Sequence, residues 1–401
     1  MHGVVPARTF LSSRLLTRHF HYTPLIFPAF PTFQNPAIRT RQPLKQARAD
    51  AGAKEKPAGV SCPVNDRGKD CRARNAALKN PDFKQPSIAD VESAREEIRP
   101  WLPPTASGSY PALSALAGTE LIVKHENHQP TGAFKVRGGI NLLSRISEED
   151  RRRGVISAST GNHGQSIAYA ARLFQARAII TVPEGANPSK VASMRALGAE
   201  VVFHGENFDD AREEVERRSA AEGLRYIHSA NEPLLIAGVA TCTLEIIEEQ
   251  PDLDVLIVPI GGGTGAAGAG LVLENMSPKT ELIGVQAEEA PAACLSWQQG
   301  DLVEAPMATK AEGLATRCAF ELTQDMLRRH LDDFVLVSEK EMNAAVRILL
   351  EKTRNLAEPS GAAALAAALK LKDRLAGKKV AVVLSGGNIS TAQLREILST
   401  T

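Results

Sequence analysis

The chain has 401 residues, of which 43% are hydrophobic and 23% are charged, a composition that is ordinary for a globular protein. Its formal net charge of +1 argues against nucleic acid or an anionic membrane as a partner, and no apolar run of ~18 residues predicts a membrane-spanning helix. The five scattered cysteines indicate neither a disulfide framework nor a zinc site.

The N-terminal segment differs in kind from the rest of the chain. Residues 1–49 contain seven basic residues, and the first acidic residue is Asp50. This composition is typical of an organellar transit peptide, and an unstructured leader explains it equally well. We expect residues 1–84 to be a disordered leader or transit peptide. The protein is then expected in the cytoplasm, or in the mitochondrial matrix if the leader is a targeting peptide.

From about Ile88 the apolar residues recur with regular periods. Ser87 is a candidate cap for a helix that ends before Pro103. Strands and helices then alternate, which is typical of an α/β fold with largely parallel sheets. Apolar runs predict strands at 121–124, 155–157, 178–182, 200–203, 255–259, 282–285, 334–337 and 380–384, and the remaining pattern predicts helices at 164–174, 190–197, 208–221 and 234–249.

A first motif, residues 129–138, places Lys135 at a turn that enters a helix. The positive helix end and the neighbouring Arg137 both disfavour a protonated amine there. A neutral amine suits a lysine that forms an imine with a carbonyl group. A solvated lysine at a helix start has the same pattern, and spacing alone favours that simpler interpretation.

A second motif, residues 157–165, puts small polar residues between a buried strand and a helix. Such a turn presents N–H groups and hydroxyls to an anion, for example a carboxylate. An ordinary capped turn is the alternative, and a histidine such as His163 is more often structural than catalytic.

A third motif follows the strand at 255–259, where Gly261, Gly262 and Gly263 precede a helix. Glycines let the backbone approach phosphate oxygens, so the turn predicts a phosphate site. No Gly-Lys-Ser/Thr follows, which disfavours a nucleoside triphosphate site, although a dinucleotide loop looks similar.

A fourth motif begins with Ser385 at the end of the strand at 380–384 and continues to Asn388. Ligands bind at the carboxyl ends of strands in open α/β sheets, which makes this serine a candidate contact. A plain turn at the end of a strand is the alternative.

In this order, the four motifs resemble those of the fold-type II (tryptophan synthase β-like) pyridoxal-phosphate (PLP) enzymes. Within that group they are similar to the threonine/serine dehydratases (ammonia-lyases) and serine racemase. The resemblance covers about residues 88–396. Its most specific segments are 130–138 and 159–163, and residues 358–362 are a further match.

The resemblance implies two domains, each with a mostly parallel sheet flanked by helices. Residues 85–149 and 232–401 are expected to form a large PLP-binding domain, and residues 150–231 a small mobile domain. The cofactor would lie in the cleft between them, and the small domain would close on the substrate.

The resemblance also implies the roles of individual residues. Lys135 is expected to bind pyridoxal 5'-phosphate covalently and, once released, to take the Cα proton of the substrate. A neutral serine at the pyridine nitrogen favours loss of a β-substituent over transamination. The cofactor would contact Phe134 and Glu358 at the ring, Asn162 at the ring hydroxyl, Ser385 at the ring nitrogen, and Gly261, Gly262, Gly263 and Thr264 at the phosphate. The substrate carboxylate would lie against Ser159, Thr160, Gly161, Asn162 and His163.

Three positions depart from the pattern of these families. Thr264 replaces the usual fourth glycine of the phosphate turn. Gln286 and Ala292 stand where metal-binding relatives carry acids, so we expect no metal site, because an amide and a methyl group are poor ligands for a hard cation. Thr160 replaces the alanine of many dehydratases and the serine of serine racemase, and its hydroxyl is a candidate second proton carrier.

The expected activity is threonine/serine dehydratase, an ammonia-lyase that gives 2-oxobutyrate or pyruvate plus ammonia. Serine racemase and hydroxyaspartate dehydratase are the enzymatic alternatives, and a PLP-binding or amino-acid-sensing protein is the non-enzymatic one. The expected partners are a small amino-acid substrate and further copies of the chain in a dimer or tetramer. We expect neither nucleic acid nor a membrane as partner, and no regulatory domain after the catalytic core.

Overall fold

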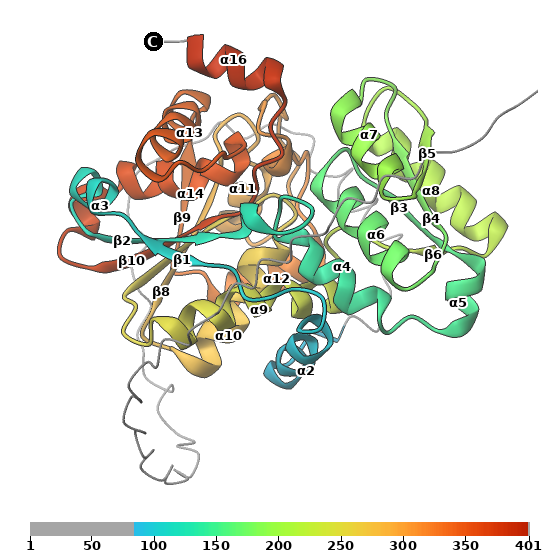
Figure 1. The fold of residues 1–401 in the computed structure, drawn as a ribbon, viewed down its shortest axis with the longest axis horizontal. Helices are drawn as coiled ribbons and strands as arrows, with labels where there is room; N and C mark the ends of the chain where they lie inside the picture. The colour runs from blue at the N-terminus through green and yellow to red at the C-terminus, as the bar shows by residue number, and fades with distance from the viewer. Residues whose placement is uncertain (1–83, 400–401) are drawn as a thin grey trace, which may run out of the picture. The chain divides into compact units, whose positions relative to one another are not determined.

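The computed structural model describes residues 84–399, so the expected leader lies, up to residue 83, outside the described residues. The helices and strands alternate along the chain as predicted (Figure 1). The helices are α2 (Ile88–Ile98), α3 (Pro111–Ala117), α4 (Lys135–Leu143), α5 (Glu148–Arg153), α6 (Asn162–Leu173), α7 (Pro188–Ala196), α8 (Phe208–Glu222), α9 (Pro233–Glu249), α10 (Thr264–Met276), α11 (Ala292–Gln299), α12 (Glu321–His330), α13 (Glu339–Thr353), α14 (Pro359–Lys370), α15 (Lys372–Leu375) and α16 (Thr391–Ser399), with 3-10 turns η1 (Glu126–His128) and η2 (Glu312–Leu314).

Six strands form the larger sheet, in the order β1-β2-β10-β7-β8-β9. All neighbours run parallel except β1 and β2, which pair antiparallel at one edge. Because β10 lies between β2 and β7, three distant parts of the chain become neighbours in this sheet. The strands are β1 (Ser107–Ser109), β2 (Glu120–His125), β7 (Val255–Pro259), β8 (Glu281–Ala287), β9 (Asp333–Val337) and β10 (Lys379–Leu384).

Four parallel strands form a second sheet, in the order β5-β4-β3-β6. Two strands of the fold were not predicted, β1 in the larger sheet and β6 in this one. Both are too short and too polar to give an apolar run, so only their partner strands reveal them. The strands of this sheet are β3 (Val155–Ala158), β4 (Ala178–Val182), β5 (Glu200–Phe203) and β6 (Arg225–Tyr226).

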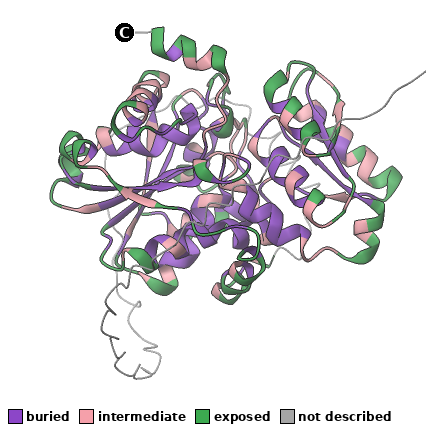
Figure 2. Ribbon diagram, in the orientation of Figure 1, coloured by how far each residue is buried: buried purple, intermediate pink, exposed green. Residues whose placement is uncertain are grey.

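The central strands supply two cores, because successive residues of a strand point to opposite faces of the sheet. In β7, Val255 and Ile257 pack into the core beneath α13 and α14. Leu256 and Val258 pack into the opposite core beneath α9 and α10. Figure 2 shows these strands, α9 and α14 as largely buried, whereas α13 is buried on one face only. Burial of both faces explains why the strand sequences are almost wholly apolar.

Helix α4 packs against α9 on one side and α6 on the other, and two glycines permit this contact. A Cβ on Gly138 would lie 2.9 Å from the carbonyl oxygen of Leu235 in α9. A Cβ on Gly139 would lie 2.4 Å from Oγ of Ser166 in α6. The two glycines that follow Lys135 and Arg137 therefore fix how closely the helix that starts at Lys135 approaches its neighbours.

The start of α2 confirms the predicted cap. The Ser87 hydroxyl accepts a hydrogen bond from the backbone N–H of Asp90, whose carboxylate accepts one from the Ser87 N–H, which is a capping box. Within residues 84–399, the structure contains no helix that is both long and apolar enough to cross a bilayer.

Candidate active site

Three neighbouring parallel strands of the larger sheet deliver predicted site residues to one edge. Strands β2, β10 and β7 run in the same direction, so their carboxyl ends lie together. Lys135 follows β2, Ser385 directly follows β10, and Gly261 follows β7. In the second sheet, the turn that begins at Ser159 follows β3 in the same way.

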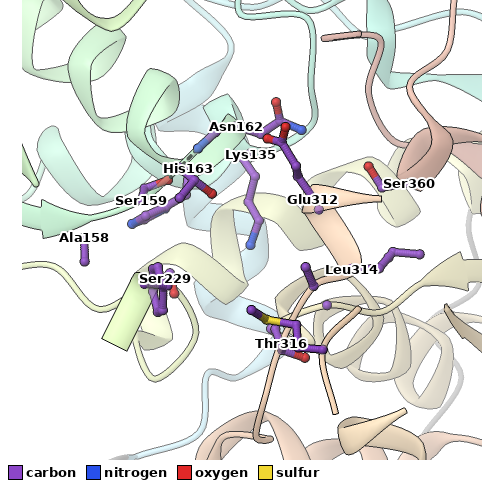
Figure 3. A pocket seen from close by; sticks show the side chains of 18 of the residues that line it. Lys135, Ala158, Ser159, Asn162, His163, Ser229, Glu312, Leu314, Thr316 and Ser360 are labelled. Carbon is purple, nitrogen blue, oxygen red and sulfur yellow. Dashed lines mark hydrogen bonds between the residues drawn. The ribbon is translucent and has the colours of Figure 1, made fainter. Parts of the chain in front are cut away.

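These strand ends open into one cavity of about 420 Å³, a size that is common for small-molecule sites. Figure 3 shows Lys135, Asn162 and Glu312 among the side chains that line this cavity. All of the site residues predicted from the sequence line it: Phe134, Lys135, Ser159, Thr160, Gly161, Asn162, His163, Gly261, Gly262, Gly263, Thr264, Glu358 and Ser385.

Lys135 is the first residue of α4, and its half-buried side chain enters the cavity. Its Nζ donates a hydrogen bond to Oγ1 of Thr264 at 2.8 Å and lies 5.3 Å from the centre of the Phe134 ring. Burial lowers the pKa of the Lys135 amine to about 8. A larger fraction of this amine is therefore neutral near neutral pH than for an ordinary lysine.

The expected influence of Arg137 on Lys135 is wrong. Arg137 is buried, and its guanidinium binds Glu126 at 2.7–2.8 Å and Glu245 at 2.6–2.8 Å. Lys124 adds a second cation to this network through Glu245, at 2.8 Å. Arg137 is therefore paired with carboxylates and does not line the cavity, and desolvation accounts for the lowered pKa of Lys135.

The glycine turn between β7 and α10 is shaped by close backbone contacts. A Cβ on Gly261 would lie 2.1 Å from the carbonyl oxygen of Gly313, and Gly263 takes a left-handed φ of +91°. Thr323 Oγ1 donates a hydrogen bond to the carbonyl oxygen of Gly262 at 2.9 Å, which stabilises the turn. The first N–H groups of α10 have no acceptor within the helix, so the turn suits a phosphate.

The turn between β3 and α6 is shaped by side chains instead. The Ser159 hydroxyl accepts hydrogen bonds from the N–H groups of Gly161, at 3.2 Å, and Gly164, at 2.9 Å. His163 Nε2 lies 3.0 Å from the Ser157 hydroxyl, and its buried Nδ1 finds no partner among the described residues. Burial lowers the pKa of His163 to about 3, so this imidazole is neutral.

Asn162 ties α6 to the larger sheet. Its Nδ2 donates to Glu358 Oε1 at 2.6 Å, and its Oδ1 accepts from Asn388 at 2.9 Å. Asn388 also donates to the carbonyl oxygen of Thr131 at 2.7 Å. The Asn162 amide thereby connects Glu358, the N-cap of α14, and Asn388, after β10, to the turn at 159–163. This is the turn that was predicted to hold a carboxylate.

The sequence did not reveal Lys190 and Glu312, which also line the cavity. Lys190, in α7, donates to Glu312 Oε2 of η2 at 2.6 Å, and its Nζ lies 3.8 Å from Glu358 Oε2. Both residue types are common on helix surfaces, and the two positions are 122 residues apart. Arg212 and His228 are further lining residues without a signal in the sequence.

Gln286 was singled out as a poor metal ligand, and its amide has protein partners. Its Oε1 accepts from the N–H of Cys294 at 3.1 Å, and its Nε2 lies 3.4 Å from the Thr316 hydroxyl. Ala292 is the first residue of α11 and has no ligand atom in its side chain. Between residues 84 and 399, no three side chains of His, Cys, Asp or Glu gather as metal ligands would.

Comparison with known proteins gives a consistent result. A family model described as pyridoxal-phosphate dependent enzyme matches residues 98–386. The chain is 38% identical over 315 residues to an L-threonine ammonia-lyase of Thermotoga maritima, which is 78% of each chain. It is also similar to two solved structures: the processed form of threonine deaminase isoform 2 from Solanum lycopersicum, with a TM-score of 0.75, 30% identity and coverage of 78% of this chain and 92% of that one, and maize serine racemase, with a TM-score of 0.75, 29% identity and coverage of 79% and 97%.

Proposed function

The chain belongs to the family of pyridoxal-phosphate-dependent enzymes, and from this premise we propose that it removes water from threonine or serine and releases 2-oxobutyrate or pyruvate with ammonia. The family, the α/β fold class and the cofactor predicted from the sequence are thereby confirmed. One observation carries the proposal: a lysine amine, a glycine-rich helix start and a small polar helix start open into the same cavity.

The residues present fit pyridoxal 5'-phosphate. Glycine is favoured at position 261, because a Cβ there would lie 2.1 Å from a carbonyl oxygen, and the start of α10 beside it suits a phosphate. We propose that the turn from Gly261 to Thr264 binds the phosphate and that Lys135 binds the cofactor covalently. Phe134 and Glu358 would lie at the ring, with Asn162 at the ring hydroxyl and Ser385 at the ring nitrogen.

The cofactor, when bound, supplies delocalisation of the negative charge that develops at the substrate Cα. The Lys135 amine, whose pKa burial lowers to about 8, takes the Cα proton once it is released from the cofactor. Residues 159–163 hold the substrate carboxylate at the start of α6, where the helix dipole favours an anion. The neutral hydroxyl of Ser385 would not stabilise a protonated ring nitrogen, which favours loss of the β-hydroxyl, as water with a proton from solvent, over transamination.

A second candidate function is racemisation of serine, and Thr160 is the observation that favours it. Its side chain lines the cavity, so its hydroxyl is available as a second proton carrier beside Lys135. Racemisation needs proton transfer on both faces of Cα, whereas elimination needs only one face. Hydroxyaspartate dehydratase activity is the remaining enzymatic alternative, and it differs from threonine dehydration by a second carboxylate on the substrate.

Two measurements test this proposal. Borohydride reduction of the holoenzyme should leave a PLP adduct on Lys135 that a Lys135→Ala variant lacks. L-threonine, L-serine and L-threo-3-hydroxyaspartate should then be compared for release of 2-oxo acid and ammonia. Release of D-serine without 2-oxo acid would favour the racemase, and an adduct without any turnover would favour a PLP-binding sensor.

We also propose that residues 150–231 form a mobile small domain and that the chain acts as a homodimer or homotetramer in the cytoplasm or the mitochondrial matrix. Light scattering after size exclusion measures the oligomeric state. Limited proteolysis with and without substrate tests closure of the small domain. Imaging of the chain with and without residues 1–49 tests the location.

A further inference from the structure

Thr264 stands where the run of three glycines ends, as the first residue of α10. Its side chain is buried, and its hydroxyl accepts the hydrogen bond that Lys135 Nζ donates at 2.8 Å. Within residues 84–399, Lys135 Nζ donates no other hydrogen bond. Thr264 therefore provides the hydrogen-bond acceptor that orients the free amine.

A hydroxyl is a suitable partner for an amine that must become neutral. A carboxylate at this distance would stabilise the ammonium form and raise the pKa of the lysine. The Thr264 hydroxyl fixes the direction of Nζ without adding a negative charge, and it lies at the positive end of α10, which disfavours a second cation. A neutral acceptor therefore raises the pKa of Lys135 less than a carboxylate would, and burial keeps this pKa at about 8.

We propose that Thr264 is a positioning residue for Lys135, whose amine it holds whenever the lysine is not covalently bound to the cofactor. The lysine is free of the cofactor before the cofactor binds, and it would be free again while the substrate is bound to the cofactor in its place. A glycine at this position, as elsewhere in the turn, would offer the amine no acceptor. The inference rests on the proposed role of Lys135 as the residue that binds the cofactor.

The competing explanation is that the Thr264 hydroxyl serves only as a ligand of the cofactor phosphate. Pyridoxal, which lacks the phosphate, separates the two roles because it reports on the amine alone. The experiment uses cofactor-free full-length chains of the wild type, Thr264→Ser, which keeps the hydroxyl, Thr264→Val, which keeps the shape, and Thr264→Gly. Lys135→Ala is the control that should form no adduct.

The rate of adduct formation is measured from pH 6 to 10 with pyridoxal and with pyridoxal 5'-phosphate, by absorbance. Loss of one hydrogen bond of ordinary strength predicts that Thr264→Val and Thr264→Gly react with pyridoxal about threefold to tenfold more slowly, with Thr264→Ser close to wild type. The apparent pKa of the rate should fall in the two variants without a hydroxyl, because the ammonium form loses its acceptor, so the rates are compared at pH 10, where the amine is neutral in every variant. Thr264→Gly keeps the test decisive if Thr264→Val does not fold.

Equal rates with pyridoxal in all folded variants, with slower binding of pyridoxal 5'-phosphate alone, would overturn the inference and leave Thr264 as a phosphate ligand. An adduct that forms normally in an enzyme that never eliminates water from threonine or serine would instead refute the proposed activity and leave this inference standing. Absence of an adduct in the wild type would overturn both the inference and the role of Lys135.

Discussion

Two turns of the site connect the same kinds of element but are shaped by different contacts. Each leads from a buried parallel strand to the start of a helix, β7 to α10 and β3 to α6. The turn between β7 and α10 is shaped by a close contact between backbone atoms, since Gly261 faces the carbonyl oxygen of Gly313. At the second, a side chain organises the turn, since the Ser159 hydroxyl accepts from two N–H groups.

The difference follows from what each turn is proposed to bind. A cofactor phosphate stays in place through many turnovers, so a rigid turn within one sheet suits it. A substrate carboxylate arrives and leaves, so a turn that can shift suits it better. Polar contacts of Asn162 connect the second turn to Glu358 and Asn388, and Lys190 of α7 pairs beside it with Glu312.

The largest expected effect comes from adding one methyl group to the glycine turn between β7 and α10. Gly261→Ala places a Cβ 2.1 Å from the carbonyl oxygen of Gly313, so backbone must move. We expect the free energy of unfolding to fall by about 3 kcal/mol and PLP affinity to fall by about 100-fold. Denaturant titration and cofactor titration measure both quantities.

Gly161→Ala is the matched change in the other turn. Its Cβ would lie 3.5 Å from Lys190 Nζ and 3.8 Å from Glu312 Oε2, which are ordinary contacts. We expect a loss of about 1 kcal/mol, unchanged PLP affinity and a higher KM for the amino acid. If both variants lose the cofactor equally, the two turns do not differ as described.

The second prediction concerns the amine that lies between the turns. The pKa of Lys135 is about 8 in the folded chain and 10.5 for an ordinary lysine, so the unfolded chain binds more protons between these values. Stability of the cofactor-free chain should therefore rise as the pH rises from about 8 to about 10.5. Lys135→Met removes the penalty and should be more stable than wild type at pH 7, by about 2 kcal/mol for this half-buried group.

Urea titration of both cofactor-free chains at pH 7 and pH 10 measures this difference. The gap should shrink at the higher pH, because the wild-type amine is then neutral in the folded state. A gap that is independent of pH would mean that packing of the methionine, rather than desolvation of the amine, sets the difference.

The contrast between the turns also explains what the sequence could reveal. The strands at 255–259 and 380–384 are continuous apolar runs because both of their faces are buried, so their positions and the turns after them were predictable. Burial of Lys135 did not follow from its place at the start of α4, where spacing alone favours a solvated lysine. The partners of Arg137 were not predictable, because Glu126 and Glu245 reach it from η1 and α9. Short strands such as β6 are defined only by their pairing with a neighbouring strand, so their own sequence does not reveal them. Lys190 was not predictable either, because the sequence around it is that of an ordinary helix.

The third prediction breaks an ion pair that lies beside the second turn, close to Gly161. Lys190 has a side chain that is only 9% exposed, and it pairs with Glu312 at 2.6 Å. Lys190→Met should lower the free energy of unfolding by about 1–2 kcal/mol, because Glu312 loses its buried partner but can still reach solvent. It should raise KM for the amino acid about tenfold with a smaller change in kcat, since the paired Lys190 side chain would no longer pack beside Gly161, in the turn proposed to hold the substrate carboxylate.

Arg177→Met is the control, because the ion pair of Arg177 with Glu200, at 2.7 Å, is about half exposed on both sides. An exposed pair contributes about 0–1 kcal/mol, so this variant should keep the wild-type KM. Equal effects of the two variants would contradict a special role for Lys190.

The smallest effects should come from removing the hydroxyl that supports each turn. Ser159→Ala deletes the acceptor of the Gly161 and Gly164 N–H groups, and Thr323→Val deletes the donor to the Gly262 carbonyl oxygen. Each loss should cost about 1 kcal/mol of stability, since one or two neutral hydrogen bonds disappear.

The two variants should then separate in what they bind. Ser159→Ala should raise KM several-fold and leave PLP affinity unchanged, because the altered turn is the one proposed to hold the substrate carboxylate. Thr323→Val should weaken PLP about threefold to tenfold and leave KM unchanged, because the carbonyl that it holds belongs to the glycine turn. Isothermal titration with PLP and steady-state kinetics measure the two quantities independently. A reversed pattern would exchange the ligands assigned to the two turns, and this outcome would remove the physical reason for glycines at one helix start and hydroxyls at the other.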